Sequence, residues 1–305
     1  MVVAERDRLP DPVAGVAKIP GAGSARAMRV EVLRAFGHRR IALVGLVILT
    51  VAALTAVAAP LIAPYDPTAF HPTDRFAPPG SAYLLGTDDT GRDLLSRMLY
   101  GARISLSVAV IATLIALAVG VSLGLLAGYI GGPVDTVVMR VLDGFLAIPP
   151  ILLALTLVTA LGPGVTKVTI AIGVQGIPLA ARLARALALV EKNKDYVLAA
   201  RSIGGRDVYI LRRAILPNCF SPIIVMASLL AANAILQEAA LSFLGFGPRP
   251  PAASWGSLLQ SGYNFMSHSI WFVTFPGIAI FLVVWSLNVV GDALRDGLDP
   301  RLRGM

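Results

Sequence analysis

Long runs without a charged side chain divide this sequence. No Asp, Glu, Lys or Arg occurs in residues 41–65, 104–134, 144–166, 168–181, 214–237 and 250–291. A helix needs about 20 mostly apolar residues to cross a bilayer. Five of the six runs reach that length, and the run 168–181 continues with apolar residues past Arg182 and Arg185 to Val190. The pattern therefore predicts an all-α integral membrane protein with six transmembrane helices.

The predicted crossings have bounds set by prolines, glycines and charges. They are Ile41–Ala63, Ile104–Tyr129, Val134–Leu161, Val165–Val190, Asn218–Phe243 and Ile270–Val290. Forty residues precede the first crossing, which is too long a start for a signal peptide, so we expect an uncleaved membrane helix.

The segments between the crossings complete the expected organisation. We expect a disordered cytoplasmic tail at 1–28, and at 29–63 an amphipathic helix that leads into the first crossing. An external segment with a short helix near 91–100 is expected at 64–103. The core domain then covers 104–290, and a cytoplasmic tail covers 291–305. Inside the core domain, 191–217 is predicted to be a cytoplasmic loop and 244–269 a second external segment.

Composition and charge support this picture and orient it. Hydrophobic types make up 56% of the chain and charged types 14%, against about 25% charged in soluble domains, which excludes an ordinary soluble enzyme. Of the 26 Lys and Arg residues, 20 fall on the side shared by both termini. The positive-inside rule makes that side the cytoplasm. The net charge of +8 thus reflects topology, and no basic face for nucleic acid is visible.

Several crossings carry glycines, prolines or polar residues that are unusual in a membrane helix. Gly120, Gly124 and Gly128 are spaced four apart, which places them on one face where a neighbouring helix can approach closely. Arg182 and Arg185 are expected to reach towards the inner headgroups. Candidates for a translocation path are the helix-breaking prolines and the polar residues of the fifth crossing: Pro149, Pro150, Pro178, Asn233 and Glu238. The alternatives are a purely structural kink for the prolines and a structural hydrogen bond for Glu238.

No catalytic or metal-binding constellation is visible in the sequence. The three histidines, His38, His71 and His268, lie outside the predicted crossings, and neither a His-Glu-x-x-His nor a Gly-x4-Gly-Lys-Ser/Thr motif occurs. The single cysteine, Cys219, is interpreted as a packing residue. We therefore expect no catalytic residue, no metal and no cofactor in this chain, while a passive channel remains an alternative.

The cytoplasmic loop carries a helical pattern. Tyr196, Ala199, Ala200 and Ile203 stand at i, i+3, i+4 and i+7, which places them on one face of a short helix that Gly204-Gly205 should end. Asp207 is expected to cap a second helix with Val208, Leu211 and Ile215 on one face. Because so short a helix is marginal alone, it should pack either on this chain's own helix ends or in a groove of a cytoplasmic partner.

The same loop resembles the EAA loop of ABC importer permeases. The resembling stretch runs from Tyr196 through Ala199-Ala200 and Gly204 to Ile215-Leu-Pro-Asn218. Further matches, in order, are Leu85-Gly-Thr-Asp-Asp-Thr-Gly-Arg-Asp93, Tyr100-Gly-Ala-Arg-Ile-Ser-Leu106, Ala127-Gly-Tyr-Ile-Gly-Gly132, Glu238-Ala-Ala-Leu-Ser-Phe-Leu-Gly245 and Gly291-Asp-Ala-Leu-Arg-Asp-Gly-Leu-Asp-Pro300. Over residues 33–303 the chain is similar to the second permease subunit of dipeptide, oligopeptide and nickel importers.

This resemblance implies a fold, partners and site residues. It implies the type I ABC importer transmembrane fold, a homologous permease as heterodimer partner, two ATPase subunits that hold ATP and Mg²⁺, and an external substrate-binding protein. The residues implied in ATPase coupling are Asp195, Tyr196, Ala199, Ala200, Ile203, Gly204, Ile210, Leu216 and Pro217. Two positions depart from the family pattern: Leu198 replaces a glutamate and Ala214 a histidine.

The expected cargo follows from the same resemblance. The family imports peptides, or nickel and other small solutes. A metal-selective path would favour clustered His, Cys or carboxylate side chains, and the crossings contain no such cluster. Di- or oligopeptides are therefore the favoured substrate, with nickel as the alternative.

Overall fold

The computed structural model describes residues 40–298, with side chains to residue 297. The segments predicted for 1–28, for the amphipathic helix before residue 40 and for the end of the C-terminal tail lie outside the described residues. The secondary structure of residues 40–298 is helical, joined by loops and turns, with one isolated bridge between Thr87 and Asp93. The elements are α2 (Arg40–Ile62), η1 (Pro72–Asp74), α3 (Leu94–Ile130), α4 (Gly132–Leu146), α5 (Pro150–Leu161), α6 (Val165–Glu191), α7 (Asp195–Ser202), α8 (Asp207–Tyr209), η2 (Ile210–Ile215), α9 (Leu216–Phe243), α10 (Trp255–Asn264) and α11 (Ile270–Leu298).

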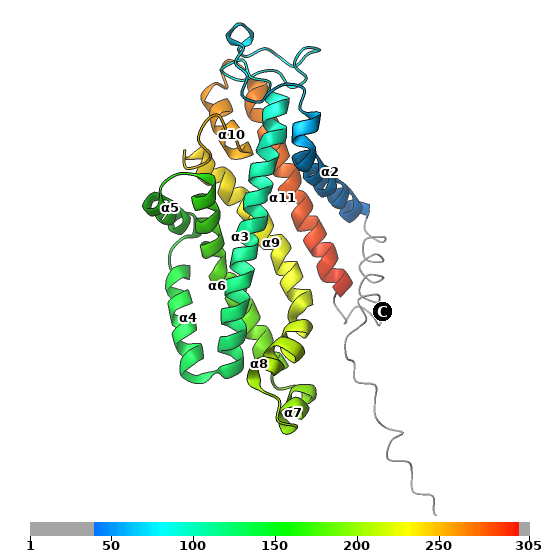
Figure 1. Ribbon diagram of the computed structural model, residues 1–305, viewed down its shortest axis with the longest axis vertical. Coiled ribbons are helices and arrows are strands. Elements are labelled where there is room, and N and C mark those ends of the chain that lie inside the picture. The colour runs from blue at the N-terminus through cyan, green and yellow to red at the C-terminus, as the bar shows by residue number, and fades with distance from the viewer. Residues whose placement is uncertain (1–39, 299–305) are drawn as a thin grey trace, which may run out of the picture.

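Five helices of the described chain are long and apolar enough to cross a membrane: α2, α3, α6, the continuous run through α8 and α9, and α11. They run roughly lengthwise through the molecule, with α7 at one end and α10 near the other (Figure 1). Helices α4 and α5 make a sixth span if the bent pair is counted as one. The all-helical fold class predicted from the sequence is confirmed.

The third predicted crossing is bent far more sharply than a kinked helix. Helices α4 and α5 meet at 91°, and α5 projects sideways from the bundle (Figure 1). Pro149 has an extended backbone with ψ 134°, and Pro150 begins α5. Since proline fixes φ and disfavours a helical residue before it, the Pro149-Pro150 pair separates the two helices.

Helix α3 corrects the prediction of a separate short helix near 91–100. It is continuous over 37 residues and includes the last part of the predicted external segment 64–103. The side chain of Asp93 caps its first turn by accepting a hydrogen bond from the Ser96 backbone at 2.8 Å. No proline lies between the cap and Gly131, so nothing in the sequence breaks the helix between its first turns and the predicted crossing.

The glycines of α3 bring α6 into close contact. A Cβ atom at Gly120 would lie 2.6 Å from the Ile177 carbonyl oxygen, and one at Gly128 would lie 2.7 Å from that of Arg185. Gly124, between them, faces the backbone of Ala181. The predicted small-residue packing face is confirmed, and the alanines of α6 are its counterpart.

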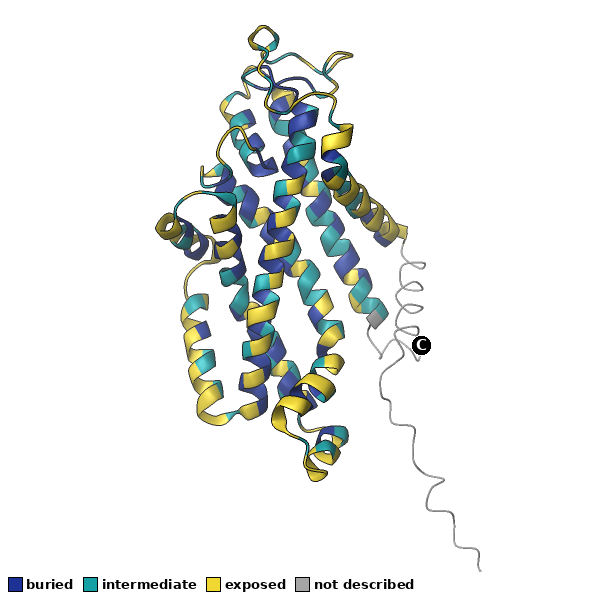
Figure 2. Cartoon of the chain, viewed as in Figure 1, coloured by how far each residue is buried: buried dark blue, intermediate teal, exposed yellow. Residues whose placement is uncertain are grey.

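Burial separates the inner faces of the bundle from the outer ones (Figure 2). The main core is formed by α3, α6, α9, α10 and α11, with contributions from α2 and α5, around residues such as Val108, Ile235 and Val283. Helix α2 packs on α11, where Gly45 lies against the Ser286 backbone. Its other side is apolar and exposed, with Val57 and Leu61 among the exposed side chains, as expected for a surface in contact with lipid tails.

The segment 64–93, predicted to be external, folds onto the start of α3 through a buried carboxylate. Asp88 is fully buried and accepts hydrogen bonds from Thr90, from the Arg92 Nε at 2.7 Å and from Arg97. Burial alone would raise the pKa of Asp88, but Arg97, Thr90 and Arg92 outweigh it and lower the pKa of this carboxyl. Phe76 stacks on His268 with ring centroids 5.1 Å apart, which joins the segment before α3 to the one between α10 and α11.

Candidate coupling loop and membrane path

The short helix α7 rests on its own chain. Its buried residue Val197 packs in a cluster with Ile210, Leu211, Ile215 and Tyr129. Tyr196 and Ala200 pack partly against this cluster. Helices α7 and α8 lie at the end of the bundle farthest from the external segment (Figure 1). One side of α7 therefore packs on the chain's own helix ends.

The other side of the loop leaves apolar side chains uncovered. Ile203 is 87% exposed, and Val208, Tyr209 and Leu198 are also exposed. The predicted face of α7 is thus divided: Tyr196 and Ala200 are half-buried, whereas Ala199 and Ile203 face outward. Figure 2 shows this end of the molecule largely in the colour of exposed residues. Leu198, which replaces the family's glutamate, adds an apolar side chain to the exposed surface.

Glycine ends α7, as the sequence predicts. Gly204 has φ +80°, a conformation that favours glycine. Its N–H donates to the Arg201 carbonyl at 2.9 Å, and the Gly205 N–H donates to the Ala200 carbonyl at 3.0 Å. These hydrogen bonds satisfy carbonyls that the helix end would leave free.

The second helix of the loop differs from its prediction. Asp207 does not cap it; Arg206 holds the N-cap position, and the Asp207 carboxylate accepts a hydrogen bond from the Tyr129 hydroxyl at 2.6 Å. Val208 is exposed while Leu211 and Ile215 are buried. The stretch Ile210–Ile215 is a π-helix, whose wider turns shift the buried face away from the one that α-helical spacing predicts.

The remaining coupling candidates differ in burial. Ile210 is fully buried, Leu216 is half-buried, and Asp195 and Pro217 are exposed. The Tyr196 hydroxyl donates to Glu191 at 2.6 Å. Burial raises the pKa of this phenol, and its bond to the Glu191 carboxylate raises it further. The hydroxyl therefore stays protonated and holds α7 to the end of α6.

Glu238 lies in a buried hydrogen-bond network. It is 2% exposed, and its carboxylate accepts hydrogen bonds from Ser105 at 2.9 Å and from Ser242 at 2.7 Å. Ser105 in turn accepts the backbone N–H of Trp255 at 3.2 Å. The network joins α3, α9 and α10, which favours the structural alternative for Glu238.

The other path candidates do not gather around Glu238. Asn233 is exposed and donates to the Leu229 carbonyl of its own helix at 3.0 Å. Pro149 and Pro150 are exposed at the α4–α5 bend, whereas Pro178 is buried in α6. The five residues therefore do not form one cluster in this chain.

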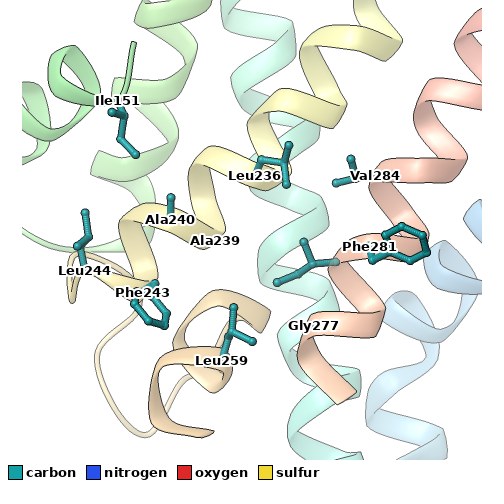
Figure 3. Close-up of a pocket in the computed structure, with 11 residues that line it drawn as sticks. Ile151, Leu236, Ala239, Ala240, Phe243, Leu244, Leu259, Gly277, Phe281 and Val284 are labelled. Carbon is teal, nitrogen blue, oxygen red and sulfur yellow. The ribbon is translucent and has the colours of Figure 1, made fainter. Parts of the chain in front are cut away.

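An apolar pocket of about 580 Å³ opens beside α9 instead (Figure 3). Its walls come from α5, α9, α10 and α11, with Ile151, Phe243, Leu259 and Phe281 among the lining side chains. Glu238 does not line it. The sequence missed this hollow because it depends on how four separate helices pack.

Two arginines of α6 have partners that the sequence did not suggest. Arg182 contacts Asp143 at 2.5 Å, and Arg185 contacts Asp135 at 2.5 Å. Both aspartates belong to α4. The turn at 131–132 folds α4 back beside α6 and brings the carboxylates within reach of the arginines. The expected approach of the arginines to the headgroups stays a prediction.

Replacing Glu238 tests the buried network. We expect Glu238→Gln to lower the unfolding free energy by less than about 1 kcal/mol, since the amide can still accept hydrogen bonds. Glu238→Ala should cost about 1–3 kcal/mol, because two buried hydroxyls lose their acceptor. Asn233→Ala, on the exposed side of α9, is the control and should change stability by about 0.5 kcal/mol at most. Thermal unfolding of the purified protein measures all three, and equal losses for Gln and Ala would contradict the network.

The fold and the loop describe a membrane-embedded subunit whose exposed short helix lies at one end of a transmembrane bundle. The family described as binding-protein-dependent transport system inner membrane component matches residues 120–304, and the N-terminal transmembrane domain of oligopeptide transport permease C matches residues 28–79. This chain belongs to the family of binding-protein-dependent transport system inner membrane components, the permease subunits of ABC importers.

Similar proteins extend over most of the chain. The dipeptide transport system permease protein DppC of Escherichia coli K12 is 47% identical over 274 residues, covering 88% of this chain and 91% of the relative. The protein of the same name from Haemophilus influenzae is 44% identical over 274 residues, covering 88% and 93%. The inward-facing MetNI methionine ABC transporter shares the fold, with a TM-score of 0.55 and 18% identity over 68% of this chain and 97% of that chain.

Proposed function

We propose that this chain forms half of the translocation path of an ATP-driven importer of di- or oligopeptides. The observation that carries the proposal is the similarity, at 40–47% identity over most of the chain, to dipeptide transport permeases. In this role it pairs with a homologous permease, receives peptides from an external binding protein and performs no chemistry itself. Separate ATPase subunits bind ATP and Mg²⁺.

Coupling to the ATPases is assigned to the loop 195–218. Its support is the uncovered apolar surface formed by Leu198, Ile203, Val208 and Tyr209 at the end of the bundle. Contiguous apolar side chains on a surface mark sites of protein interaction. Val197 packs α7 against the helix ends, and Tyr196 bonds it to α6. Because α7 is held in this way, a movement of a bound partner would be transmitted to α6 and α9.

Uptake by the assembled importer tests the function. The chain is co-expressed with its partner permease, ATPases and binding protein, and accumulation of labelled Ala-Ala is measured in cells with and without the chain. We expect ATP-dependent accumulation only with the chain present. Accumulation of ⁶³Ni²⁺ instead of peptide would favour the nickel alternative, and accumulation that continues after ATP depletion would favour a passive channel.

The proposed orientation places both termini in the cytoplasm. We expect Thr73→Cys and Ser267→Cys, both at exposed external positions, to react with an impermeant maleimide in intact cells. Ser202→Cys, exposed at the opposite end, should react only after the cells are opened. The single native thiol, Cys219, is buried, which keeps the background low. Labelling of Ser202→Cys in intact cells would reverse the topology.

A further inference from the structure

Four charged residues face one another between α4 and α6. Asp135 and Asp143 belong to α4, and Arg182 and Arg185 to α6. A cavity of about 440 Å³ opens among them, lined by Met139, Asp143, Arg182 and Arg185. Asp143, Arg182 and Arg185 therefore share one polar hollow, and Asp135 is paired with Arg185 at its side.

The pair Asp143–Arg182 lies partway along the spans rather than at the loop end of the bundle, and both side chains are about half exposed. Arg182 stands nine residues before α6 ends at Glu191, about 13 Å along the helix axis. Asp143 is near the far end of α4, four residues before the chain reaches Ala147 and the α4–α5 break. Ionisable side chains at such depth are costly and face a water-filled cavity or each other. Their presence calls for a role in the path of a polar solute.

The two ion pairs differ in how fully they are engaged. Arg185 holds Asp135 with two hydrogen bonds, at 2.5 and 2.6 Å, and the Asp135 side chain is only 18% exposed. Within the described residues, Arg182 and Asp143 share one hydrogen bond, and their side chains are 54% and 50% exposed. The first pair is a closed clamp. The second leaves guanidinium donors and carboxylate lone pairs open to the cavity.

We propose that Asp143 and Arg182 bind the charged ends of a peptide as it passes: Arg182 its carboxylate and Asp143 its ammonium group. This inference rests on the proposed peptide import. A zwitterionic peptide must lose water on entering the membrane, which is costly unless charges of opposite sign replace the water. The protein's pair is already in place, so the peptide inserts between existing partners. The contacts are exposed and single, which keeps binding weak enough for release.

Transport by the complete importer in proteoliposomes tests this inference, with Ala-Ala delivered by the binding protein. We expect Arg182→Gln and Asp143→Asn each to lower Ala-Ala transport roughly tenfold, the value of one charge-assisted contact. The double variant should transport no better than either single variant, because both ends of the peptide then lack a partner. The clamp variant Asp135→Asn/Arg185→Gln is the control and should lower thermal stability without this selective loss.

The double variant separates substrate binding from a structural ion pair. If the pair is only structural, the single variants suffer from an unpaired charge in the membrane and the double variant recovers wild-type transport. Such recovery, or wild-type transport by either single variant, would overturn the inference while peptide import stands. Wild-type import of ⁶³Ni²⁺ but not of Ala-Ala would instead remove the proposed function, and this inference with it.

Discussion

Gly124→Leu is expected to prevent assembly of the transmembrane bundle. A Cβ atom at this position would collide with the carbonyl oxygen of Ala181 and lie 2.8 Å from the Cβ of Ala184. The obstacle is helix backbone and cannot rotate away. The loss of stability should therefore exceed the roughly 1–3 kcal/mol that is usual for overpacked positions.

Gly144→Leu provides the matched control. Gly144 also lies in a helix, α4, but nothing stands within 4 Å of its would-be Cβ. Leucine has a higher helix propensity than glycine, so this variant should fold as well as the native chain. The yield of monodisperse protein after detergent extraction and its Tm measure the difference. Equal Tm values for the two variants would show that α3 and α6 are not in contact as described.

Ile203→Asp is expected to uncouple the importer without unfolding this chain. The Ile203 side chain is 87% exposed in the chain alone, so its loss removes no internal packing. If an ATPase groove covers it, burial contributes about 1.5–3 kcal/mol, and a buried carboxylate adds a further cost. Docking should weaken roughly 10- to 150-fold. The measurement is copurification of the ATPase together with peptide-stimulated ATP hydrolysis.

Ser202→Asp is the control for charge at this loop. Ser202 is exposed, directly precedes Ile203, and its hydroxyl donates to the Leu198 carbonyl of its own helix. We expect the added carboxylate to leave ATPase copurification within a factor of about 2, as for a surface change away from a contact. If Ser202→Asp and Ile203→Asp weaken binding of the ATPase equally, charge repulsion explains the effect. If neither weakens it, the loop surface is not the docking site.

Much of the fold follows from local sequence signals. Apolar runs of membrane length locate the long helices, since apolar side chains and a satisfied backbone are what a bilayer requires. The spacing of Gly120, Gly124 and Gly128 identifies the α3 packing face because a four-residue interval returns to the same side of a helix. Gly204 marks the end of α7 because glycine accepts the positive φ that the turn needs. Each signal involves neighbours within one or two turns.

The candidate site depended on contacts between distant segments. Sequence spacing placed Tyr196, Ala199, Ala200 and Ile203 on one face, but packing against η2 divides that face into a buried and an exposed part. Glu238 finds its partner Ser105 133 positions away in the chain, which no local pattern reveals.

The sequence by itself determined the class of protein, the long helices and the ends of the loop helix, because these depend on hydrophobicity and backbone preference. Only the tertiary structure decided the 91° turn between α4 and α5 and the pairing of Asp143 with Arg182. Prolines predict a break in the helix but not its angle, which depends on what the two helices pack against. A charged residue in a membrane helix indicates a free-energy cost, but its partner is decided only when the helices are assembled.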